Sequence, residues 1–249
     1  MNPDTPILRG LIKIHKEDTP IRPVINSINA PSYKLAKMFA KKLETYRPLT
    51  DIYNVKNSIQ LIEELGDIPF DPSLKLASFD IANMYTNIPT KELIHIIDSI
   101  CDLYNVDNSV KQEILTISSL LISQNCFKFQ DKTHLQRNSL AMGAPMSSIS
   151  SEVFLQYTEN TAIQDILRTS EVEGYFKYVD DVLIIYKEDG TNTNEILNQF
   201  NNITPGLNFT LEHEQDNKIN FLDLTISRDI NKFSININRT PTTTDVIIP

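Results

Sequence analysis

Two adjacent aspartates interrupt the apolar run KYVDDVLIIY, which spans residues 177–186. The surrounding valines, isoleucines and tyrosines favour β-strands, in which aspartate is depleted. Because aspartate favours turns, the run predicts a β-hairpin with Asp180 and Asp181 at its tip. A polar turn without any further function is one interpretation of such a pair.

A third aspartate changes that interpretation. The segment LKLASFDIA, residues 74–82, alternates as a half-buried strand and carries Asp80 near its end. Neighbouring strands of one sheet could bring Asp80 beside Asp180. Carboxylates about 4 Å apart repel each other by roughly 4 kcal/mol at an effective dielectric near 20. A cluster of three therefore requires protonation or a hard cation.

Magnesium fits such a cluster because it prefers oxygen ligands and is typically held by one or two carboxylates plus substrate phosphates. A pair of ions can activate a 3′-hydroxyl and stabilise a leaving pyrophosphate. We therefore expect a nucleotidyl-transfer site with two Mg²⁺ ions, with Mn²⁺ as the alternative ion. Successive strand residues point to opposite faces, so we expect Asp80 and Asp180 to hold the metals and Asp181 to be a secondary ligand or an electrostatic helper.

The rest of the chain alternates between helical and strand-like periodicity, which predicts an α+β fold with helices packed on one face of the strands. Thr90, and either Ser147 or Ser148, are expected to cap helices. Helices are expected over residues 31–46, 55–65, 90–104, 109–123, 148–168 and 194–202. Besides the two segments above, strands are expected in LRGLIKIH, RPVINSI, FKFQDKTHLQ, LNFTLEHE, INFLDLTIS and KFSININ.

Charge is distributed unevenly along the 249 residues, whose net charge is −9. Residues 1–49 carry a balance of +5 and residues 50–249 a balance of −14. A basic amino-terminal module on an acidic body is compatible with a segment that faces phosphate, although a solvated helix face gives the same count. No apolar run reaches the ~20 residues that cross a bilayer, and the first ten residues lack a signal-peptide centre. We expect an intracellular protein, nuclear or cytoplasmic, that is not secreted and has no membrane partner.

Six motifs together resemble one family. YVDD flanked by apolar residues resembles the signature of reverse transcriptases, and SFDIANMYTNIP resembles the first catalytic motif of the Penelope-like retroelement (retrotransposon) group. In the order of that family, four further segments match: IHKEDTPIRPVIN (fingers), AMGAPMSS (nucleotide pocket), NFLDLTI (primer grip) and NRTPTTTD, which follows the palm.

This resemblance implies a right-hand polymerase with an antiparallel palm sheet packed on helices. It assigns residues 1–73 to the fingers, 74–238 to the palm with inserted fingers helices, and 239–249 to the start of a truncated thumb. It implies an RNA-directed DNA polymerase that uses an RNA template, a DNA primer and dNTPs. Asp80, Asp180 and Asp181 become the metal carboxylates, with the Ile81 carbonyl as an additional ligand.

The resemblance also implies substrate contacts. Arg22 and Lys16 match the fingers pair that contacts the triphosphate, with Lys13 as a competitor for the lysine. Tyr85 matches an aromatic that lies under the sugar and excludes a 2′-hydroxyl. By the same resemblance, Met142 and Gly143 would contact the nucleotide and Lys218 the leaving pyrophosphate. The residues expected to position the primer end are Phe221, Leu222 and Asp223.

Three residues depart from the family pattern. Ser139 stands where glycine is usual, Ala144 where serine is usual, and Thr240 where lysine is usual. The chain also stops just after the palm. The missing thumb and the acidic body motivate a second hypothesis, a catalytically weak or inactive nucleic-acid-binding remnant. A glycosyltransferase or phosphohydrolase with an acidic metal motif would explain the carboxylates but neither Arg22 nor the order of the motifs.

Overall fold

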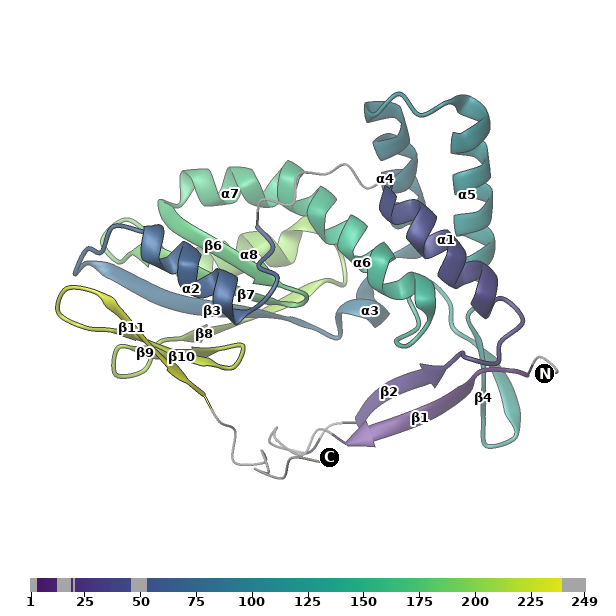
Figure 1. Ribbon diagram of the computed structural model, residues 1–249, viewed down its shortest axis with the longest axis horizontal. Helices are drawn as coiled ribbons and strands as arrows, with labels where there is room; N and C mark the ends of the chain where they lie inside the picture. Colours follow the sequence, from purple (N-terminus) through teal and green to yellow (C-terminus); the bar gives the residue numbers. More distant parts are fainter. Residues whose placement is uncertain (1–3, 13–18, 20, 46–52, 239–249) are drawn as a thin grey trace. The chain divides into compact units, whose positions relative to one another are not determined.

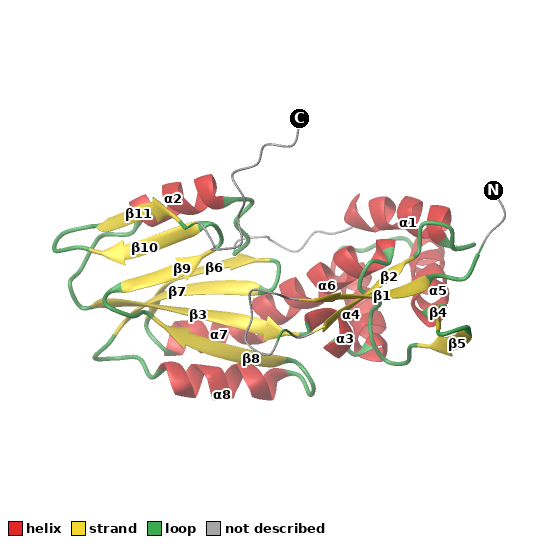
Figure 2. Ribbon diagram, turned by 90° about the horizontal axis from the view of Figure 1, so that it is seen from below, coloured by secondary structure: helices red, strands yellow, loops and turns green. Residues whose placement is uncertain are grey.

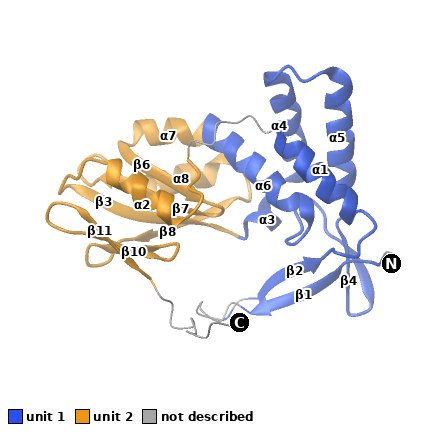
Figure 3. Ribbon diagram, viewed as in Figure 1, with its two compact units in different colours: residues 1–50, 83–161 blue, residues 51–82, 162–249 orange. Residues whose placement is uncertain are grey.

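The computed structural model describes residues 4–12, 19, 21–45 and 53–238 (Figure 1). Lys13, Lys16 and residues 239–249 of the expected thumb lie outside the described residues. The chain divides into two compact units (Figure 3), residues 1–50 with 83–161 (unit 1) and residues 51–82 with 162–249 (unit 2). Residues 51–73, which we assigned to the fingers, belong to unit 2.

Unit 2 is built on an antiparallel sheet of four strands in the order β6-β7-β3-β8. The central strand β3 (Leu74–Ala82) has the bounds that its alternating pattern predicts. The other members are β6 (Val172–Tyr178), β7 (Asp181–Lys187) and β8 (Asn208–His213). Helices α7 (Gln164–Thr169) and α8 (Thr193–Ile203) complete this part of the unit.

The two faces of the sheet have separate cores. Alternate residues of β3, among them Leu76, pack with α2 (Ser58–Asp67) and with a second, three-stranded antiparallel sheet. That sheet contains β9 (Lys218–Phe221), β10 (Leu224–Arg228) and β11 (Phe233–Ile237) (Figure 2). On the opposite face, Phe79 of β3 lies 5.3 Å, between ring centroids, from Phe200 of α8. Burial on both faces explains why β3 and β7 are so apolar.

Unit 1 joins a mixed sheet of order β2-β1-β4-β5 to a group of helices. Helix α6 packs against α1, α3 and α4, and α4 packs against α5. The strands are β1 (Ile7–Ile12), β2 (Ile21–Asn26), β4 (Cys126–Phe129) and β5 (Lys132–Leu135). The helices are α1 (Tyr33–Thr45), α3 (Met84–Asn87), α4 (Thr90–Leu103), α5 (Asn108–Ser123) and α6 (Pro145–Thr158).

Two of the helix predictions were wrong in detail. Thr90 is the first residue of α4 rather than its cap, because Pro89 occupies the N-cap position. The long helix expected to end near residue 168 starts at Pro145, and a π-helical segment, η1 (Glu159–Ile163), separates α6 from α7. Among the described residues, no helix is both long and apolar enough to span a membrane.

Candidate active site

The three aspartates singled out in the sequence meet at one corner of the unit 2 sheet. Asp80 and Asp181 are direct cross-strand partners in the β3–β7 ladder. Asp180 occupies the turn before β7, and its carbonyl accepts a hydrogen bond of 3.0 Å from the N–H of Ile81. Opposed residues of an antiparallel pair have Cα atoms about 4.5–5.5 Å apart. The predicted convergence of Asp80 with the Asp180–Asp181 pair is therefore present in the backbone.

The register adds one feature that the strand pattern did not predict. Asp181, rather than Asp180, is the residue directly opposite Asp80, so these two side chains emerge on the same face of the sheet. All three aspartates are half-buried. Thr210 of β8 donates a hydrogen bond of 3.3 Å to the Asp80 carbonyl and so supports β3 from its other side.

A strained turn presents the aspartates. Tyr178 and Asp181 pair across the β6–β7 hairpin, so Val179 and Asp180 form its two-residue loop. Val179 has φ 58°, a left-handed conformation that is unfavourable for a β-branched residue. Such conformations cost about 1–3 kcal/mol and cluster at functional sites. The strain indicates that this turn is held in a required geometry.

A lysine of β6, two residues before this hairpin tip, is buried unusually deeply. Lys177 of β6 is only 1% exposed, although lysine is rarely buried without a partner. Its backbone N–H donates to the carbonyl of Tyr53 (2.7 Å), and its carbonyl accepts from the N–H of Val55 (2.9 Å). Sequence reasoning missed Lys177; its only signal was a lysine inside an apolar strand.

The residues expected at the primer end form a fixed turn between β9 and β10. Phe221 is buried in the core, and Leu222 has φ 55°. The Asp223 carboxylate accepts a hydrogen bond from the hydroxyl of Ser58, the first residue of α2, and its carbonyl accepts one from the N–H of Asn238 (2.7 Å). Ser58 is a further residue that sequence reasoning missed. Lys218 lies at the opposite end of β9, about 13 Å from Leu222 at the usual rise per residue.

An ion pair fastens the β9–β10 hairpin to the sheet that carries the aspartates. Arg228 of β10 donates through Nε to Glu214 Oε2 at 2.7 Å, and both side chains are 8% exposed. Glu214 also accepts from the N–H of Leu76 in β3 (3.1 Å). Burial raises the pKa of the nearby Tyr186, and the charge of Glu214 raises it further.

Unit 1 contains Arg22, Tyr85, Met142 and Gly143 of the expected nucleotide residues, and backbone contacts hold the segments that carry them. The Tyr85 carbonyl of α3 accepts a hydrogen bond from the N–H of Leu140 (2.8 Å), and the Met142 carbonyl accepts one from Ile25 of β2 (2.8 Å). Gly143 has φ 97°, and a Cβ placed there would collide with the Ile25 carbonyl oxygen. Arg22, exposed, is on the same strand as Ile25.

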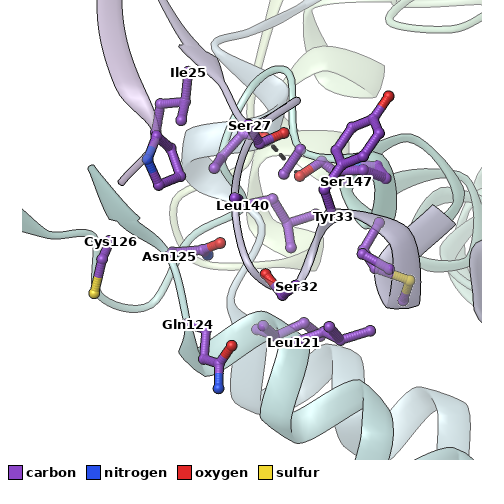
Figure 4. Close-up of a pocket in the computed structure, with 18 residues that line it drawn as sticks. Ile25, Ser27, Ser32, Tyr33, Leu121, Gln124, Asn125, Cys126, Leu140 and Ser147 are labelled. Carbon is purple, nitrogen blue, oxygen red and sulfur yellow. Dashed lines mark hydrogen bonds between the residues drawn. The ribbon is translucent and has the colours of Figure 1, made fainter. Parts of the chain in front are cut away.

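A small cavity lies beside the loop of residues 139–144, which contains Met142 and Gly143 (Figure 4). Residues of β2, α1, α5 and the start of α6 also line it. Its volume is about 40 Å³, which suits one water molecule rather than a nucleotide. Ser147 Oγ donates to the Ala141 carbonyl at 2.6 Å, and Ser27 Oγ donates to the Gly143 carbonyl at 3.0 Å. The cavity therefore belongs to the support of the loop and is not a substrate pocket.

The donor set at the aspartate corner suits magnesium. It offers carboxylate and carbonyl oxygens and no nitrogen or sulfur ligands, and Mg²⁺ usually takes its remaining ligands from water and substrate phosphate. Across the part of the chain that the structure describes, no group of three or more His, Cys, Asp or Glu side chains is arranged to hold a metal by itself. A site built from the Asp80–Asp181 pair would be completed by the substrate.

Comparison with known proteins identifies the fold. No protein-family model and no curated protein matches the chain. Telomerase from Candida tropicalis, truncated from its C-terminal domain, superposes with a TM-score of 0.69 at 13% identity, covering 94% of this chain and 55% of that one. Telomerase from Candida albicans, in complex with a fragment of telomeric RNA, gives 0.64 at 15% identity, covering 98% and 48%.

Viral polymerases also superpose. The BmCPV RNA-dependent RNA polymerase at its elongation state gives a TM-score of 0.61 at 14% identity, covering 89% of this chain and 21% of that one. The chain thus has the fingers–palm fold of template-directed polymerases, and the predicted fold class is confirmed. It spans about half the length of the telomerases that it resembles.

Proposed function

We propose that this chain is the core of an RNA-directed DNA polymerase, a reverse transcriptase of the Penelope-like group. The observation that supports it most strongly is the cross-strand pairing of Asp80 with Asp181, with Asp180 in the adjacent strained turn. The fingers–palm fold is common to polymerases that make DNA and polymerases that make RNA. The choice of DNA as the product rests on the family motifs and on Tyr85.

In this proposal the unit 2 residues hold the metal ions and the primer. Asp80, Asp180 and Asp181, with the Ile81 carbonyl, would bind two Mg²⁺ ions, which supply activation of the primer 3′-hydroxyl and neutralisation of the leaving pyrophosphate. The turn of Phe221, Leu222 and Asp223 would position the primer end. Lys218 would lie near the pyrophosphate.

The unit 1 residues bind the nucleotide. Arg22 offers a planar multidentate donor to the triphosphate, and Lys16 would accompany it. Met142 and Gly143 would line the nucleotide pocket, with glycine allowing a close backbone approach. Tyr85 would lie under the sugar and exclude a 2′-hydroxyl. The substrates implied are an RNA template, a DNA primer and dNTPs.

The second candidate is a nucleic-acid-binding remnant with weak or no catalysis. It is motivated by the acidic balance of −14 over residues 50–249, because the affinity of a protein for a nucleic-acid duplex is largely electrostatic. Intact Asp80, Asp180 and Arg22 favour the polymerase instead, since a remnant has no need of them.

Primer extension separates the two candidates. The isolated chain would be incubated with a DNA primer annealed to RNA, the four dNTPs and Mg²⁺, and primer binding would be measured in parallel. The polymerase predicts extension that requires the metal. Primer binding without any extension, at every protein and metal concentration, would establish the remnant instead.

A further inference from the structure

A groove in unit 1 is distinct from the residues assigned above. It is walled by the start of α4, the end of α5 and the segment that follows β5. Its volume is about 470 Å³, within the range of sites that bind a nucleotide-sized ligand. Lys91, His95 and Arg137 line it, and none of its described lining residues is Asp or Glu. The whole chain has a net charge of −9, so this groove is a basic region on an acidic protein.

The basic side chains of this groove have no acidic partners in the described parts of the chain. The opposite end of the same helix pair provides a comparison, because Lys111 of α5 bonds Asp98 (2.7 Å) and Asp102 (2.6 Å) of α4. The hydrogen bond to Asp102, and after it the one to Asp98, raises the pKa of Lys111. Lys91 and Arg137 are exposed and form no such ion pair with any residue that the structure describes. Their charge is available to a ligand.

The wall that carries Arg137 is held rigidly. Gln136 donates from Nε2 to Ser139 Oγ (2.8 Å) and to the Leu140 carbonyl (2.9 Å), and Ser139 Oγ donates to the Arg137 carbonyl (3.3 Å). Ser139 is the serine that replaces the usual family glycine, so this departure shapes the groove wall. The same segment continues into Met142 and Gly143, the expected nucleotide residues.

We propose that this groove binds single-stranded RNA through its phosphodiester backbone. Lys91 and Arg137 contact phosphates, which dominate the affinity of proteins for nucleic acids. The hydroxyls of Thr90 and Ser119 and the amide of Asn138 lie in the same lining and can donate to phosphate or to a 2′-hydroxyl. Only the identification of this RNA as the template strand rests on the proposed function.

The test compares two variants of the full chain that lose equal charge. Lys91→Ala/Arg137→Ala removes the groove cations, and Arg168→Ala/Lys232→Ala removes one arginine and one lysine from exposed positions of unit 2. Binding of an oligouridylate of about eight nucleotides is followed by fluorescence anisotropy without Mg²⁺, primer or dNTP. Thermal unfolding confirms that both variants are folded.

Counterion release sets the expected result. Each phosphate contact on a single strand contributes about 0.7 to the slope of log K against log salt, so the groove variant loses about 1.4 from that slope and binds about tenfold more weakly near 0.15 M salt. Arg137→Lys, which keeps the charge, retains the slope. Equal Kd and equal slope in the groove variant and the unit 2 control would overturn the proposal. Equal weakening of oligoglutamate binding would overturn its assignment to RNA.

This result is independent of catalysis. A chain that never extends a primer still shows loss of RNA binding in the groove variant, which upholds the groove and refutes only the polymerase. A chain that extends primers while the groove variant binds RNA normally refutes only the groove. In an active chain, we expect the groove variant to raise the template KM and leave kcat unchanged.

Discussion

Asp80 of β3 and Asp181 of β7 face each other across an antiparallel ladder, 101 residues apart in the chain. Like charges directly opposite each other destabilise a sheet, and both residues are half-buried. The fold therefore places two carboxylates opposite each other at the position where the proposed function requires metal binding.

Neutralising one member of this pair should stabilise the protein. In metal-free buffer, we expect Asp80→Asn to raise the free energy of unfolding by about 0.5 kcal/mol, since it removes a direct cross-strand repulsion. Urea unfolding measures the change. Asp189→Asn, at an exposed position outside the strands, is the control and should have no effect. A destabilised Asp80→Asn variant would show that the carboxylate is needed for folding.

Relieving the strain at Val179 should also stabilise the fold. Asparagine tolerates the left-handed region better than valine does, so we expect Val179→Asn to raise the free energy of unfolding by about 1 kcal/mol. The same variant should keep its primer extension, because asparagine favours the same left-handed turn that presents Asp180. Unchanged stability would mean that the turn carries no strain.

Gly143 and Gly66 provide a matched pair. A methyl group at Gly143, where φ is 97°, would collide with the Ile25 carbonyl oxygen. A methyl group at Gly66 in α2 would have no atom of the described residues within 4 Å. We expect Gly143→Ala to cost about 2 kcal/mol and to raise the KM for nucleotide. Gly66→Ala should gain about 0.5 kcal/mol from helix propensity. Equal changes in the free energy of urea unfolding for the two substitutions would contradict the close packing of Gly143 against Ile25.

Tyr85 should determine the choice of sugar. We expect Tyr85→Ala to reduce the preference for dNTP over NTP, measured as a ratio of kcat/KM values, by about tenfold or more. The exposed Tyr104, at the end of α4, is the control, and Tyr104→Ala should leave the ratio unchanged. An unaltered ratio in Tyr85→Ala would remove the tyrosine from the nucleotide site.

The sequence was most informative where the pattern is local and repetitive. The alternation in residues 74–82 predicted both ends of β3, and the apolar runs around Asp180 predicted the β6–β7 hairpin. Periodicity likewise located α1, α4, α5 and α8 to within a few residues. In each case, side-chain burial follows from spacing alone.

Features that depend on contacts between distant residues were not predictable in this way. The opposition of Asp80 to Asp181 is set by the pairing register of two strands. The burial of Lys177 depends on the backbone of residues 53–55, and the Ser58–Asp223 hydrogen bond joins residues 165 positions apart. The π-helical turn at η1 has no local sequence signature comparable to that of a helix cap.

Metal-dependent primer extension by the wild-type chain and by Asp180→Asn, with primer binding measured for both, decides whether the aspartates carry the chemistry. The wild-type chain should add dNTPs in the presence of Mg²⁺, and the variant should lose roughly 10³-fold or more of this activity while it still binds primer. Full activity in Asp180→Asn would contradict the assignment of the aspartates.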